Sequence, residues 1–176
     1  MLPLIYYVNL LLSGAICYKG TRRPVIVNSC SALGLALELA VKDYFGLPLD
    51  ISKARGIDIV ASIDGKKRFI EVKSNYSPLS EAVDRSSIMV YCFGVQPEKT
   101  LCEQWGYVLA KKDFMEIGES LHHITVKKNS KGRPETVTQT VWNNKKQQPH
   151  GAKAYKLEDA YLEAGAVSFG EFFGRA

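Results

Sequence analysis

The sequence predicts one mixed α/β domain, and three observations support this fold class. The chain has 176 residues, of which 46% are hydrophobic and 23% are charged, an ordinary globular composition with enough apolar residues for one core. Apolar residues change between helical and strand-like spacing along the chain. The expected elements follow the order helix, two strands, helix and strand, with a β-rich tail, which is typical of a mixed central sheet flanked by helices.

Residues 1–27 form an apolar N-terminal segment whose first charged side chain is Lys19. The apolar run over 2–16 is interrupted by Asn9 and Ser13 and is too short to span a bilayer. It also lacks the positively charged start of a signal peptide. We therefore expect a buried helix or a dimer contact here, a cytoplasmic protein and no membrane partner. Export would weaken the functional expectation given below.

The first core helix is expected over 32–45. Asn28 and the serines that follow it offer N-caps, and Gly46 followed by Pro48 ends the helix. Apolar residues surround this helix on almost every side, so we expect it to be buried. Glu38 lies within the apolar stretch and needs a partner, because buried carboxylates are rare unless they are paired.

Residues 57–73 alternate in the manner of a β-hairpin around an Asp-Gly turn at 64–65. With this turn, the numbers of paired residues sum to 129, so Asp58 lies directly opposite Glu71. Lys73 lies two residues beyond Glu71 and projects from the same face. Two carboxylates so placed repel each other unless a cation sits between them or one of them holds a proton.

The rest of the chain alternates between expected helices and strands. The expected elements are a helix over 79–87, a strand buried on both faces over 88–95, a strand over 106–110, a weak helix over 112–121, β-rich stretches within 124–156 and a helix over 157–164. Residues 127–156 hold eight Lys or Arg and one acid, whereas the remainder holds 15 Lys or Arg and 17 acids. A basic segment on a slightly acidic body suggests a polyanionic partner, although a solvated face explains it equally well.

Two carboxylates and an ammonium on one face suit phosphate chemistry. Mg²⁺ usually takes one or two carboxylates, keeps several waters and meets a substrate phosphate. A neighbouring lysine can orient or deprotonate water, or stabilise negative charge on phosphorus. The alternative is a surface ladder in which Lys73 pairs with one of the two acids and binds nothing.

The pattern formed by Glu38, Asp58 and Glu71-x-Lys73 resembles the PD-(D/E)xK nuclease superfamily, which includes restriction endonucleases and Holliday junction resolvases. The resemblance covers about residues 28–110. It implies a restriction-endonuclease-like αβββαβ core within a single nuclease-like domain over the whole chain. Residues 1–27 would then be an N-terminal appendage, and 111–176 a basic β-rich extension. The pattern departs at the residue before the aspartate, which is isoleucine where many members have proline.

The resemblance implies a Mg²⁺-dependent DNA endonuclease, with Mn²⁺ as a substitute metal. Asp58, Glu71 and the backbone carbonyl of Val72 would be metal ligands, Glu38 would bind metal directly or through water, and Lys73 would be the catalytic lysine. The expected DNA contacts are Arg85, Lys127, Lys128, Lys131, Arg133, Lys145 and Lys146. The partner would be double-stranded or branched DNA, and cutting both strands makes a homodimer plausible.

Other readings remain open. The same site would serve a resolvase or repair nuclease acting on branched or damaged DNA, and the fold would also serve a non-catalytic nucleic-acid binder.

The four cysteines contain no C-x-x-C pair, so free thiols in a reducing cytosol are expected. The three histidines have no cysteine at ligand spacing and are expected to be solvated.

Overall fold

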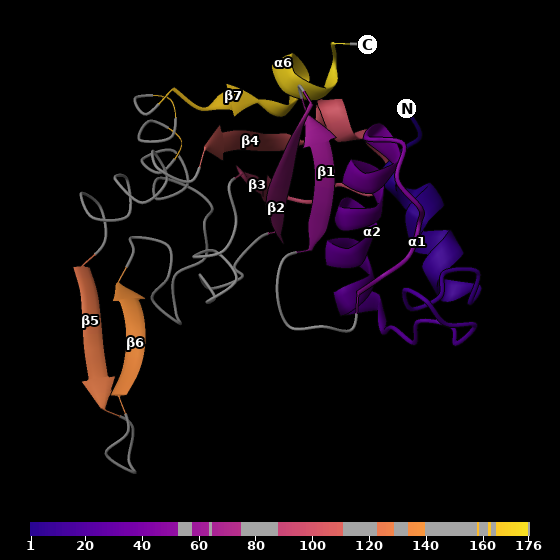
Figure 1. Ribbon diagram of the computed structural model, residues 1–176, viewed down its shortest axis with the longest axis horizontal. Coiled ribbons are helices and arrows are strands. Elements are labelled where there is room, and N and C mark those ends of the chain that lie inside the picture. The colour runs from indigo at the N-terminus through magenta and orange to yellow at the C-terminus, as the bar shows by residue number, and fades with distance from the viewer. Residues whose placement is uncertain are drawn as a thin grey trace.

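The chain folds as a mixed α/β structure around a five-stranded sheet in the order β1-β2-β3-β4-β7, with a separate two-stranded sheet β5-β6. Figure 1 shows this computed structural model, which describes residues 1–52, 58–63, 65–74, 88–110, 123–128, 134–139, 158, 162 and 165–175. The helices are α1 (Leu4–Leu12), α2 (Ser29–Tyr44) and α6 (Phe169–Phe173), with a 3₁₀ turn η1 (Leu101–Glu103). The strands are β1 (Ile59–Ile63), β2 (Lys66–Ser74), β3 (Ile88–Gly94), β4 (Trp105–Ala110), β5 (His123–Lys128), β6 (Pro134–Gln139) and β7 (Val167–Ser168).

The hairpin of β1 and β2 has the register that the sequence predicts. The antiparallel pairs run from Ile59 opposite Ile70 to Ile63 opposite Lys66, so paired residue numbers sum to 129. Gly65 in the turn has a φ of 70°, a left-handed conformation that glycine adopts without steric cost. The open end of this hairpin is therefore where Asp58 meets the end of β2.

The pairing of β2 with β3 makes the sheet mixed, because these strands are parallel while β3 with β4 and β4 with β7 are antiparallel. Parallel neighbours need a crossover connection, commonly a helix. The expected helices over 79–87 and 112–121 lie outside the described residues. The expectation of a doubly buried strand at 88–95 is confirmed, since the five central residues of β3 are buried.

Helix α2 covers one face of the sheet, and α1 lies outside it (Figure 1). The Asn28 side chain accepts a hydrogen bond from the Ser31 amide at 2.9 Å, so the helix begins three residues before the predicted 32–45. The Tyr7 hydroxyl of α1 donates to Asp43 of α2 at 2.6 Å. The N-terminal segment thus forms a helix with a buried face, as expected. Within the described residues, no helix is long and apolar enough to cross a membrane.

A close approach between α2 and β2 sets the position of the helix on the sheet. A Cβ added to Gly34 would lie 3.2 Å from the Ser74 hydroxyl oxygen, closer than most Cβ contacts. Glu38 lies one helical turn further along α2, on the same side as Gly34. The missing side chain at Gly34 therefore brings Glu38 down beside the open end of the hairpin.

A second close approach, between β4 and the C-terminal helix α6, completes the core. A Cβ at Gly106 of β4 would lie 2.6 Å from Phe169 of α6 and 2.6 Å from the Tyr91 carbonyl oxygen. Phe169 is fully buried and packs edge to face on Phe173, with ring centroids 5.1 Å apart. The bare backbone of Gly106 is therefore what lets α6 pack on the sheet.

We expect Gly106→Ala to lower the free energy of unfolding by about 1–3 kcal/mol, because the new methyl group must displace a buried ring or a strand carbonyl. Urea denaturation measures this change. Gly94→Ala is the matched control, since a Cβ there meets nothing within 4 Å, and its effect should stay within about 0.5 kcal/mol. Equal losses in the two variants would contradict the packing argument.

Candidate functional site

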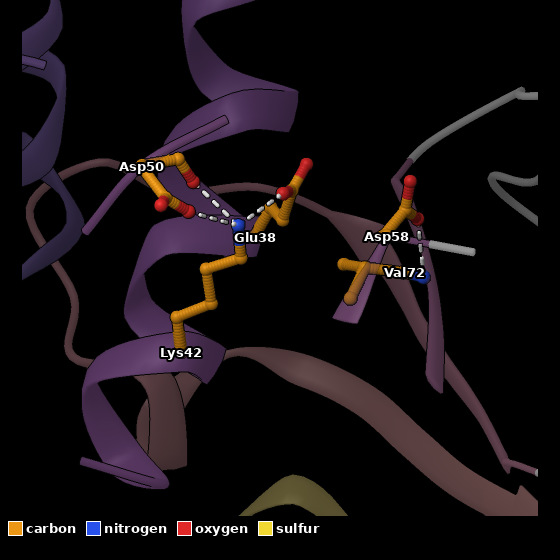
Figure 2. A network of polar contacts seen from close by, with 5 residues as sticks. All are labelled: Glu38, Lys42, Asp50, Asp58 and Val72. Atoms are coloured by element: carbon orange, nitrogen blue, oxygen red, sulfur yellow. Dashed lines mark hydrogen bonds and ion pairs between the residues drawn. The ribbon is translucent and has the colours of Figure 1, made fainter. Parts of the chain in front are cut away.

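The candidate site lies at the open end of the hairpin, and Asp58 fixes its first position. The Asp58 Oδ2 atom accepts a hydrogen bond from the Val72 backbone amide at 2.8 Å (Figure 2). Strand β1 begins one residue later, at Ile59. The carboxylate therefore takes the place of a strand carbonyl in the ladder, which holds it against β2.

Glu71 and Lys73 of β2 form a buried ion pair. The Lys73 ammonium donates to Glu71 Oε1, and Glu71 is only 1% exposed. The other oxygen, Glu71 Oε2, is buried and has no hydrogen-bond partner within the described part of the chain. An unsatisfied oxygen on a buried carboxylate is costly, so this atom marks a place where a further positive group would be stabilising.

Glu38 has a partner that the sequence analysis did not find. The Lys42 ammonium lies 3.1 Å from Glu38 Oε1 and 3.3 Å from Asp50 Oδ1, and it also donates to the Asp50 carbonyl (Figure 2). Lys42 is 5% exposed, so its three donors are all used inside the protein. The i,i+4 spacing of Glu38 and Lys42 is a helical pair that could have indicated this contact.

Burial and neighbouring acids raise the pKa of Glu38 to about 7. Loss of hydration is the largest cause, and the negative charges of Asp58 and Glu71 add to it. Lys42 opposes the shift through its charge and its hydrogen bond. Glu38 therefore binds a proton much more readily near neutral pH than an exposed glutamate does.

The pKa of Asp58 is also raised, to about 6. Burial is again the largest cause, and the charge of Glu71 also raises the pKa. The Val72 amide, Lys73 and Lys42 each lower it. The two lysines thus act on Asp58 together, and the three acids behave as one electrostatic cluster.

The members of this cluster come from both sides of the sheet. The side chains of Val72 and Ser74 face α2, since Val72 packs on the hydrophobic core and Ser74 lies beside the helix. Alternation along β2 places Glu71 and Lys73 on the opposite face. Glu38 belongs to α2 and approaches the strand ends from the helix side, so these acids meet around the end of the hairpin.

Within the described residues, no group of three or more His, Cys, Asp or Glu side chains lies close enough together to hold a metal ion. Glu38, Asp58 and Glu71 share an electrostatic environment without forming a three-ligand site. Two carboxylates are enough for Mg²⁺, which keeps several waters as ligands.

The charge of the cluster and its unpartnered oxygen fit a divalent cation. The carboxylates are Glu38, Asp50, Asp58 and Glu71, and the ammonium groups are Lys42 and Lys73. When these four acids and two lysines are all ionised, two negative charges remain uncompensated. A divalent ion at Asp58 and the free oxygen of Glu71 would balance that charge.

The structure describes only some of the predicted DNA contacts. Lys127 and Lys128 belong to β5, which pairs antiparallel with β6, and their side chains are outside the described part. The remaining predicted contacts, Arg85, Lys131, Arg133, Lys145 and Lys146, also lie outside it. The β-rich character predicted for 124–156 is confirmed for the residues of β5 and β6.

Comparisons with known proteins add no assignment. No family model, no curated protein and no solved structure gives a significant match to this chain. The resemblance to PD-(D/E)xK nucleases therefore rests on four side chains and their placement, and the function must be argued from the geometry of the site.

We expect Lys42→Met to lower the free energy of unfolding at pH 8 by about 3–5 kcal/mol, because it leaves Glu38 and Asp50 without their buried cation. Arg175→Met is the matched control. Arg175 forms the same i,i+4 contact with Glu171, but their side chains are 72% and 55% exposed, so its loss should cost less than about 1 kcal/mol. Similar costs measured by urea denaturation would contradict the role of burial.

The raised carboxyl pKa values also predict how stability changes with pH. Glu38 and Asp58 bind protons more tightly in the folded chain than in the unfolded chain. Their contribution is therefore complete below about pH 4 and is lost as the pH rises through about 6 for Asp58 and about 7 for Glu38.

Urea denaturation between about pH 5 and pH 8 tests this dependence. The loss of stability over that range should be about 2–3 kcal/mol smaller in Glu38→Gln than in the unsubstituted protein. Glu103→Gln is the control, because the hydrogen bonds of Thr100 lower the pKa of Glu103 and keep it ionised throughout. Parallel pH curves for Glu38→Gln and the unsubstituted protein would refute the prediction.

Proposed function

We propose that this chain is a Mg²⁺-dependent DNA endonuclease of the PD-(D/E)xK type. The observation that carries the proposal is the open end of the hairpin. There Asp58 is held against the strand that bears Glu71 and Lys73, and a buried Glu71 oxygen has no hydrogen-bond partner among the residues that the structure describes. A buried excess of carboxylate charge beside a lysine is the composition that metal-assisted phosphate hydrolysis needs.

The fold supports the proposal at a coarser level. A helix bearing a glutamate is followed by the hairpin bearing Asp58 and the E-x-K sequence, and then by a strand parallel to β2. This order is similar to most of the αβββαβ core of the superfamily. Between α2 and β3 the described residues contain two strands, so one strand of that core has no described counterpart.

Asp58, Glu71 and the carbonyl of Val72 would hold Mg²⁺, with Glu38 acting through water from the helix side. The ion would polarise the scissile phosphate and lower the pKa of a bound water. Lys73 is held beside Glu71, so its ammonium can donate to a phosphate oxygen as negative charge builds during in-line attack. The positive charge of Lys42 partly offsets the negative charge around Asp58 and lowers the pKa of this residue.

DNA and a second copy of the chain are the partners in this proposal. The basic segment 127–156 would contact the phosphate backbone through non-specific charge. The outer side of α1 offers an apolar surface for a homodimer. The exposed apolar side chains there are Ile5, Tyr6 and Leu12 of α1, together with Met1 and Leu2, which precede the helix. A homodimer would bring two sites to the two strands of a duplex.

A purely structural hairpin is the second reading, and one observation favours it. Lys73 is paired with Glu71, which a salt-bridged hairpin also requires, and the described residues contain no three-ligand group. This reading predicts no affinity for Mg²⁺ or Mn²⁺. The burial of Glu71 argues against a surface ladder. An exposed ion pair would stay hydrated, whereas this pair has lost hydration at a cost in free energy.

A plasmid assay tests the proposed activity. Supercoiled DNA incubated with the protein and Mg²⁺ or Mn²⁺ should become nicked or linear, and EDTA should abolish the reaction. Asp58→Ala and Lys73→Ala should each lower the rate by about 100-fold or more, because Asp58 would hold the metal ion and Lys73 would stabilise the developing charge. Glu103→Ala and Lys99→Ala, which change a carboxylate and a lysine outside the cluster, should cut at the unsubstituted rate.

The substrate panel includes a branched DNA junction, which separates a resolvase from an enzyme that cuts ordinary duplex. Cleavage of neither substrate, together with no Mg²⁺ or Mn²⁺ binding by calorimetry, would reject the nuclease and leave the structural hairpin. A strict monomer that still makes double-strand breaks would remove the homodimer from the proposal.

A further inference from the structure

The turn end of the β1–β2 hairpin carries three consecutive cations, Lys66, Lys67 and Arg68, called here the basic tip. Lys66 and Lys67 are exposed, and Arg68 is half-buried. The residues opposite them across the hairpin are Ile63, Ser62 and Ala61, none of which is charged. Hairpins commonly set opposite charges across from one another, and this one does not.

The basic tip has no acidic partner among the ion pairs of the described residues. Outside the segment 127–156 the chain has more acidic than basic side chains, so it contains carboxylates that could have paired with the basic tip. Three adjacent cations repel one another, and a polyanion that binds them relieves that repulsion.

Lys67 connects the basic tip to the candidate site. Alternation along β2 places Lys67, Phe69 and Glu71 on one face. The Lys67 ammonium lies 5.3 Å from the centre of the Phe69 ring, so its side chain leans along the strand toward Glu71. Val60, the residue opposite Phe69, is 42% exposed, so this face reaches solvent.

The spacing suits a phosphate backbone. Lys67 lies four positions before Glu71, which is about 14 Å along a strand. A DNA strand with one phosphate at the candidate site would place another of its phosphates near Lys67 a few nucleotides away. From the open end to the turn, β2 carries Lys73, Glu71, Phe69 and then the three cations of the basic tip, and Asp58 lies beside the open end.

We propose that the hairpin is a binding track for the strand being cut: the basic tip holds the phosphate backbone a few nucleotides from the scissile phosphate, and so sets which bond lies over Asp58 and Glu71. This inference rests on the proposed nuclease function and adds a DNA-binding surface to it. Lys67 contacts the phosphate backbone on the face of Glu71, and Lys66 and Arg68, which alternation places on the other face, add positive charge at the turn end. Backbone contacts of this kind position a nucleic acid without reading its sequence.

The experiment measures DNA binding in EDTA, so that its result does not depend on metal or on cleavage. A fluorescein-labelled duplex of about 20 base pairs is titrated with protein, and anisotropy is followed at salt concentrations from about 50 to about 300 mM. The combined variant Lys66→Gln, Lys67→Gln and Arg68→Gln should bind about tenfold or more weakly. The slope of log affinity against log salt should become shallower by about 1 or more, one unit for each lost phosphate contact.

The matched control removes the same charge elsewhere, by Lys19→Gln, Arg22→Gln and Arg23→Gln, three exposed cations of the loop after α1. Its loss of affinity should be much smaller, with nearly the original salt slope. Thermal unfolding checks that both variants are folded, and Lys67→Arg should bind like the unsubstituted protein because it keeps the charge.

Each outcome decides the inference. Unchanged binding by the basic-tip variant, or equal losses in both variants, would overturn the track even if metal-dependent cleavage is found. Loss of binding specific to the basic tip, without any cleavage of plasmid or junction, would support the track while rejecting the nuclease. Absence of DNA binding by the unsubstituted protein would overturn the track directly.

Discussion

The structure depends on a constraint of charge: more negative than positive charge is buried where α2 meets the open end of the β1–β2 hairpin. Removing a carboxylate from water costs several kcal/mol unless a cation and hydrogen bonds replace the lost hydration. Lys42 serves Glu38 and Asp50, and Lys73 serves Glu71, while Asp58 has a backbone amide as its hydrogen-bond donor. The raised carboxyl pKa values express the part of the cost that these partners do not offset.

Backbone geometry maintains that arrangement. The left-handed turn at Gly65 fixes the hairpin register, and a shift of one residue would turn Glu71 toward the helix. Gly34 has no side chain to hold α2 away from Ser74, so the helix brings Glu38 within electrostatic range of Asp58. Local turn chemistry and one close helix–strand contact therefore decide which acids meet.

The sequence was sufficient where the signals are local. The Asp-Gly turn predicts the hairpin register, Asn28 and Gly46 bracket α2, and the apolar run predicts β3. The sequence did not predict the ion pair of Lys42 with Asp50, because that contact joins a helix to a loop whose path depends on tertiary packing. The pairing of β7 with β4 has the same origin: two residues are too short a strand to leave a periodic pattern. The resemblance placed the acids together, but it gave no account of how their charge is balanced.

The Lys73–Glu71 ion pair would serve both a metal site and a purely structural hairpin. A buried ion pair is a weak source of stability, and apolar residues of similar size often replace such pairs without loss. A hairpin that needed only to fold would gain little from burying Glu71 with one oxygen unsatisfied. The same oxygen would favour the binding of a cation. Its carboxylate has already lost its hydration on folding, so this cost is not incurred again when the ion binds. A buried carboxylate oxygen left without a partner among the described residues, beside a second carboxyl group of raised pKa, is explained better by cation binding than by stability.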